Sequence, residues 1–75
     1  MKHFEDIWEE AESLIEEVDN PESIAKIKEL LVDIENPETI GKILFELAGI
    51  SKKYNINVAA SLQLAIDNEK IENYG

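Results

Sequence analysis

Two stretches of this sequence decide the fold: VDNPESIAKIKELL at residues 18–31 and IENPETIGKILFEL at residues 34–47. They align without gaps, and seven of the fourteen positions are identical. Each contains Asn-Pro-Glu, in which Asn can cap a helix, Pro suits the first helical position and Glu faces the positive end of the helix dipole. Apolar residues then follow at helical spacing. The pair predicts consecutive helices over 21–34 and 37–54.

The repeat of these two stretches, with its period of 16 residues, has two explanations. Two short helices that need the same cap and the same apolar stripe can converge on similar sequences. Alternatively, one helix-turn unit was duplicated, which would also account for Lys26 and Lys42 at equivalent positions. The sequence leaves both explanations open, although two copies are too few for a solenoid.

The flanking segments predict two more helices, over 3–18 and 58–72. Apolar residues recur in the first segment at steps of three and one: Phe4, Ile7, Trp8, Ala11, Leu14, Ile15 and Val18. In the last segment Asn57 can supply the cap, and Leu64 and Ile71 lie off the main stripe, so this helix is apolar on two sides.

The predicted helices are joined by loops of only a few residues, which favour antiparallel neighbours. We therefore expect an all-α fold, a small antiparallel bundle of about four helices that forms a single domain over residues 1–75.

The composition excludes several classes of function. The chain has 75 residues, 17 acidic and 7 basic side chains, a net charge of -10 and no cysteine. Thiolate metal sites and cysteine nucleophiles are absent, and the only histidine is His3. A pI near 4.3 disfavours direct nucleic-acid binding. No apolar run is long enough to cross a membrane, and early acids interrupt any signal peptide, so we expect a cytoplasmic protein.

Glu5, Glu9, Glu12 and Glu16 step by four, three and four residues and line one face of the first predicted helix. Eight acids and one lysine occupy residues 1–20. A solvated face that keeps a small bundle soluble is one explanation, and a surface for a basic partner is another. A third is a site for a hard cation such as Mg²⁺. Like charges at four-residue spacing destabilise an isolated helix slightly, which favours a partner or a cation.

Gly41, Phe45 and Gly49 follow one another at four-residue spacing on the third predicted helix, off its main stripe. Glycine inside a helix costs about 1 kcal/mol relative to alanine, so close approach of another helix is expected to offset it. This face is a candidate surface for self-association or for a partner, and the alternative is that the fourth helix of the same chain crosses there.

Residues 39–74 resemble the second half of the MazG-like nucleotide pyrophosphohydrolases, through Ile40-Gly41, Ile43-Leu44-Phe45, Asn55-Ile56-Asn57 and Asn73-Tyr74. Glu9-Glu10-Ala11-Glu12 is similar to the first acidic helix of that family. The resemblance implies a Mg²⁺-dependent hydrolysis of nucleoside triphosphates, with Glu9, Glu12 and Glu16 as metal ligands. Thr39 and Lys42 occupy the positions of the second acidic pair of the family.

The sequence favours a non-catalytic, acidic interaction or regulatory protein without a cofactor, which presents a negative surface to a basic protein partner. Mimicry of nucleic-acid charge is one version of this function. The Mg²⁺-dependent MazG-like enzyme, or a degenerate relative, is the first alternative, and a homo-oligomerisation module is the second. The predicted partner-binding residues are Glu5, Glu9, Glu12, Glu16, Gly41, Phe45, Gly49 and Leu64.

Overall fold

The computed structural model describes residues 3–74 and consists of helices in the order α1 (Phe4–Ser13), α2 (Asn20–Leu30), a 3₁₀ turn η1 (Leu31–Asp33), α3 (Pro37–Lys53) and α4 (Val58–Tyr74). The predicted all-α class with four α-helices is confirmed. Residues 1, 2 and 75 of the predicted domain lie outside the described residues. Within the described part of the chain, no helix has the length and the apolar content that a membrane span requires.

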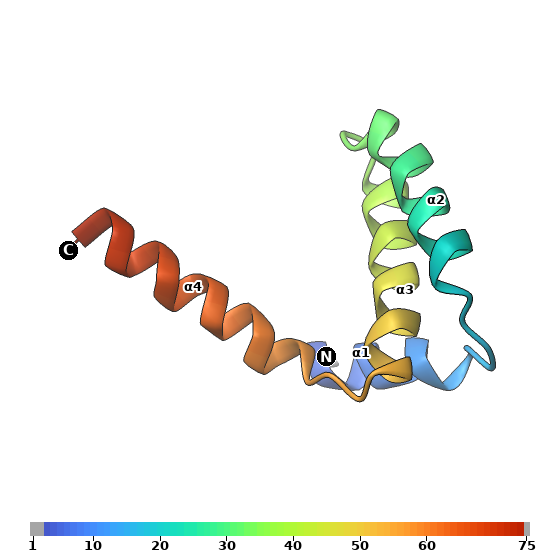
Figure 1. The fold of residues 1–75 in the computed structure, drawn as a ribbon, viewed down its shortest axis with the longest axis horizontal. Helices are drawn as coiled ribbons and strands as arrows, with labels where there is room; N and C mark the ends of the chain where they lie inside the picture. Colours follow the sequence, from blue (N-terminus) through green and yellow to red (C-terminus); the bar gives the residue numbers. More distant parts are fainter. Residues whose placement is uncertain (1–2, 75) are drawn as a thin grey trace.

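The helices α2 and α3 form an antiparallel hairpin, α1 lies across the base of α3, and α4 leaves that base on the side away from α2 (Figure 1). The hairpin turn is organised by Asp33, whose carboxylate accepts bonds from Thr39 Oγ1 at 3.2 Å and Asn36 Nδ2 at 3.4 Å. Asn36 in turn caps α3 by accepting from the Glu38 amide at 2.9 Å. The Asn-Pro signal therefore begins α3 as predicted.

The equivalent cap of α2 differs from the prediction. Asp19, not Asn20, occupies the N-cap, and its carboxylate accepts from the Glu22 amide at 3.5 Å. The side-chain amide of Asn20 instead donates to the hydroxyl of Tyr54, which ties the start of α2 to the end of α3. The sequence repeat is thus not matched by equivalent capping contacts.

The first helix ends at Ser13, whereas the periodicity predicts a helix over 3–18. Residues 15–19 continue without helical structure. Lys52 at the end of α3 donates to the carbonyl oxygens of Glu12 and Ile15, at 2.8 and 2.6 Å, and so satisfies carbonyls at the end of α1. If the helix continued, the carboxylates of Glu12 and Glu16 would lie side by side on one face and would repel each other.

Trp8 fixes α1 on α3 through its indole nitrogen, which donates to Ser51 Oγ at 3.2 Å. The Ser51 hydroxyl is buried and donates to the carbonyl oxygen of Ala48 at 2.9 Å. Phe4 packs against the Trp8 ring with centroids 5.5 Å apart. Trp8 is therefore a packing residue that joins two helices.

The turn after α3 sets the direction of α4. Asn55 has a positive φ of 53°, and the amides of Asn55 and Ile56 donate to the carbonyls of Lys52 and Ser51 at 3.3 and 2.9 Å. This pair of bonds is the Schellman motif. Asn57 then caps α4 as predicted, because its side chain accepts from the Ala60 amide at 3.0 Å.

Candidate functional site: an acidic cleft between the α1–α2 linker, α2 and α3

The site is built by the linker that joins α1 to α2, residues 14–19. Its Ile15 and Val18 are half-buried and rest on Gly49 of α3. A Cβ at Gly49 would lie 3.2 Å from Val18 Cγ2 and 3.4 Å from Ile15 Cδ1, so a larger residue here would require the linker to shift by a few tenths of an ångström. The prediction that another helix approaches Gly49 is therefore wrong, because the segment that lies on Gly49 is the non-helical linker.

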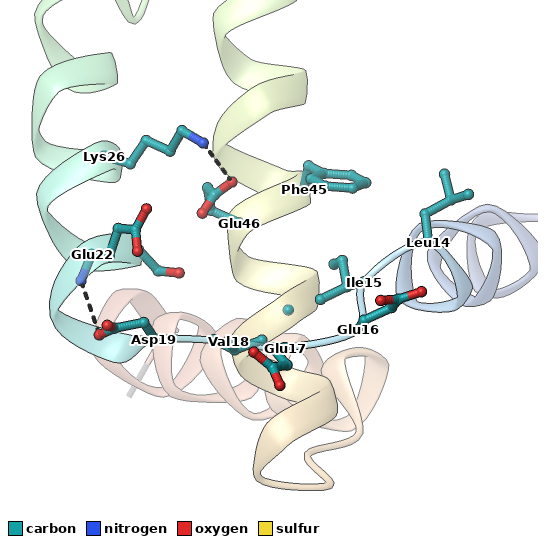
Figure 2. Close-up of a pocket in the computed structure, with 12 residues that line it drawn as sticks. Leu14, Ile15, Glu16, Glu17, Val18, Asp19, Glu22, Lys26, Phe45 and Glu46 are labelled. Atoms are coloured by element: carbon teal, nitrogen blue, oxygen red, sulfur yellow. Dashed lines mark hydrogen bonds and ion pairs between the residues drawn. The ribbon is translucent and has the colours of Figure 1, made fainter.

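The linker, α2 and α3 enclose an open cleft of about 300 Å³, which we call the acidic cleft (Figure 2). Its walls bring together residues that are far apart in the sequence. The lining residues are Leu14, Ile15, Glu16, Glu17, Val18, Asp19, Glu22, Ser23, Lys26, Phe45, Glu46 and Gly49.

Five carboxylates and one ammonium group line the acidic cleft. The ammonium of Lys26 lies 3.9 Å from a carboxylate oxygen of Glu46, and this pair joins α2 to α3. The Asp19 carboxylate is partly used as the cap of α2. Glu16 and Glu17 are exposed on the linker. The cleft therefore carries an excess of negative charge that its own lysine does not neutralise.

The acidic cleft also has apolar walls. Phe45 keeps 38% of its surface exposed, and Leu14 keeps 71%. Figure 2 shows both side chains on the same side of the cleft, with Ile15 between the linker and α3. Carboxylates beside apolar surface suit a guanidinium or ammonium group on an aliphatic stem, because the stem packs while the charge stays paired.

A second hollow, the α1 cleft, lies between α1, the α3–α4 turn and the start of α4. It measures about 580 Å³. Glu5, Glu9 and Glu12 line it together with Trp8 and Lys52. Because the Lys52 ammonium already binds the carbonyls at the end of α1, this cleft is also open to a cation, although it holds fewer carboxylates than the acidic cleft.

The structure divides the predicted partner-binding residues among different surfaces. Glu5, Glu9 and Glu12 line the α1 cleft, whereas Glu16 lies beyond the end of α1 and lines the acidic cleft. The prediction that all four acids share one helix face is therefore wrong, because α1 ends at Ser13.

The predicted row on α3 is divided as well. Phe45 and Gly49 line the acidic cleft, with Gly49 covered by the linker. Gly41 is exposed and would have nothing within 4 Å of an added Cβ. Leu64 lies on α4 with 66% of its surface exposed. Gly41 and Leu64 line neither cleft.

The carboxylates proposed for a metal, Glu9, Glu12 and Glu16, do not converge. Within residues 3–74, no group of three or more His, Asp or Glu side chains is placed to hold a metal ion. Thr39 is buried and bonds to Asp33 in the hairpin turn. The three acids therefore do not form a ready-made site for Mg²⁺ in this conformation.

Several lining residues of the acidic cleft were not predicted. Glu17, Asp19 and Glu22 come from the linker and the start of α2, and Glu46 comes from α3. The dense acids at 16–22 and the unexplained glycine at 49 were the available signals. The structure shows that these two features belong to one site, because the linker crosses Gly49.

No family model, no curated protein and no solved structure matches this chain.

Proposed function

We propose that this protein is a non-catalytic acidic binding module, which holds a basic segment of a partner protein in the acidic cleft. The observation that carries the proposal is the cleft itself, whose walls hold five carboxylates and one lysine together with the exposed ring of Phe45. An arginine side chain fits this combination, because its guanidinium can pair with two carboxylate oxygens while its stem covers apolar surface.

The net charge of -10 supports the same proposal at longer range. A strongly negative protein attracts a basic partner before contact and accelerates the encounter, and this attraction weakens as salt shortens the Debye length. The apolar wall formed by Phe45 and Leu14 would then add contact energy that salt does not remove. We therefore expect binding that depends on salt but also on the aliphatic part of the ligand.

The test is a titration with a short fluorescein-labelled peptide of alternating arginine and leucine, followed by anisotropy. We expect micromolar affinity at low salt and a loss of about tenfold or more on going from about 0.05 to about 0.5 M NaCl. The same peptide with citrulline in place of arginine has similar size and no charge. Equal affinity for the citrulline peptide would contradict the proposal.

Variants locate the binding site. Glu16→Gln with Glu17→Gln removes two charges from the acidic cleft and should weaken binding by about fivefold or more. Glu29→Gln with Glu35→Gln removes the same number of charges at exposed positions outside the cleft, and as the matched control it should have a smaller effect.

Trp8 lines the α1 cleft and is the only tryptophan, so its emission reports on that cleft. Binding in the acidic cleft should leave Trp8 emission unchanged. A shifted emission together with sensitivity to Glu9→Gln would place the peptide in the α1 cleft instead.

A further inference from the structure

The helix α4 has almost no neighbours in its own chain. Figure 1 shows it extending away from the α2–α3 hairpin. Val58 and Ala59 are half-buried at its start, and residues 60–72 are all exposed. Most helical stability in proteins comes from packing of an apolar face against other segments, and α4 has little such packing within its own chain. The cap at Asn57 does not replace such packing.

The exposed side chains of α4 include large apolar residues on two sides. Leu62 and Ile66 lie on one side, with 54% and 40% of their surface exposed. Leu64 and Ile71 lie on the other side, with 66% and 68% exposed. A helix that is apolar on more than one side is normally buried between neighbours.

The helix α3 has an apolar strip that is partly exposed. Ile40, Leu44 and Leu47 follow one another at helical spacing and keep 39%, 41% and 41% of their surface exposed. The buried residues in this part of α3 are Thr39 and Ile43. We call these three residues the outer face of α3. None of them carries a charge.

The core of the single chain is very small. Among the residues whose burial the structure describes, the buried apolar ones are Ile43 and Ala48. A domain of this size has a marginal core even when its apolar residues are well covered. The partly exposed strips on α3 and α4 are therefore apolar surface whose burial would stabilise the fold.

We propose that two copies of this chain exchange their α4 helices, so that α4 of each copy packs on the outer face of α3 of the other. In this arrangement one side of α4 contacts the α3 helix of the partner and the other side contacts the α4 helix of the partner. Both apolar sides of α4 are then covered.

The area agrees with a stable dimer. Covering the outer face of α3 and the four exposed apolar side chains of α4 would remove on the order of 700 Å² per copy from water. A standard stable interface buries about 800 Å² per partner. The exchange therefore supplies an interface of ordinary size.

The lack of charge on the outer face of α3 argues against a basic protein as its occupant. The carboxylates are concentrated on α1 and the linker, at the base of α3, whereas the outer face of α3 is uncharged. A basic partner would gain little from that face and would bind the acids instead. The Schellman turn at Asn55 and the half-buried start of α4 hold α4 away from its own α3.

The proposal is tested by light scattering coupled to size-exclusion chromatography over a range of protein concentrations. We expect a mass near twice 8.5 kDa. Leu44→Glu on α3 and Leu64→Glu on α4 should each raise the dissociation constant by at least about tenfold. Val32→Glu makes the same change at a residue that is 90% exposed on η1, outside the proposed interface, and should leave the mass unchanged.

Hydrogen exchange gives a second readout that does not depend on the variants. The α4 amides should be protected in the dimer and should exchange rapidly on dilution to the monomer. A monomer at all concentrations would overturn the proposal, and protected α4 amides in that monomer would show that α4 folds back on its own α3. A dimer that both variants leave intact would also overturn it.

The two proposals fail independently. A monomeric Leu44→Glu variant that still binds the arginine peptide would leave the proposed function standing. A wild-type dimer without peptide binding would leave the exchange of α4 standing.

Discussion

Replacing Gly41 and Gly49 by alanine, one at a time, tests the origin of the acidic cleft. Both glycines lie inside α3, so each change gains about 1 kcal/mol of helix propensity. Their surroundings differ completely. A Cβ at Gly41 has nothing within 4 Å, whereas a Cβ at Gly49 lies 3.2 Å from Val18 Cγ2 and 3.4 Å from Ile15 Cδ1.

The expected result is a difference between two otherwise identical changes. Gly41→Ala should stabilise the protein by about 1 kcal/mol. Gly49→Ala gains the same propensity but pushes the linker outward, and overpacking of this kind costs about 1–3 kcal/mol. Its net effect should therefore lie between neutral and a loss of about 2 kcal/mol. The Gly49 variant should melt lower than the Gly41 variant by at least about 4 °C.

Urea and thermal unfolding followed by circular dichroism measure this difference, with all variants at one low micromolar concentration so that association contributes equally. The arginine-peptide titration supplies an independent readout, because a displaced linker should weaken binding in Gly49→Ala alone. Equal stabilisation by both alanines would show that the linker does not rest on Gly49, and the cleft as described would then be wrong.

Two further predictions concern the contacts that place α1 and α4. Asn55 has a left-handed φ of 53°, so Asn55→Gly should stabilise the protein by about 0.5–1 kcal/mol and Asn55→Ala should destabilise it by a similar amount, measured by urea unfolding; the opposite order would contradict the Schellman turn. Trp8→Phe and Ser51→Ala, combined in a double-mutant cycle, should show a coupling of about 0.5–1.5 kcal/mol from their hydrogen bond, whereas additive effects would mean that the bond does not form in solution.

The sequence predicts three of the four helices well because their starts carry explicit signals. Asn36 begins α3 and Asn57 begins α4 as capping residues. Pro21 and Pro37 fix the first turns of α2 and α3. These signals act locally, through the free amides of the first turn, so they can be interpreted without knowing the tertiary structure.

The end of α1 could not be predicted in the same way. The segment LIEEV at residues 14–18 contains no glycine or proline and continues the helical spacing of apolar residues. What ends the helix lies on α3, where Lys52 binds the carbonyls of Glu12 and Ile15 and Gly49 admits the linker. The linker forms one wall of the acidic cleft. Because the sequence predicts that residues 14–18 are helical, it does not predict the cleft either.

The helical spacing of apolar residues also does not predict which segment covers each apolar strip. It identifies Ile40, Leu44 and Leu47 as apolar positions of a helix and Leu64 as a second apolar side of α4, but it does not say which segment covers them. In the single chain they stay exposed, while the buried apolar residues among those described are Ile43 and Ala48. So small a core contributes little to the free energy of unfolding. Burial of the exposed strips against another molecule would remove apolar surface from water and would also enlarge the core. The thermal stability of the protein should then rise with its own concentration, as mass action requires of a dimer whose interface forms part of its core.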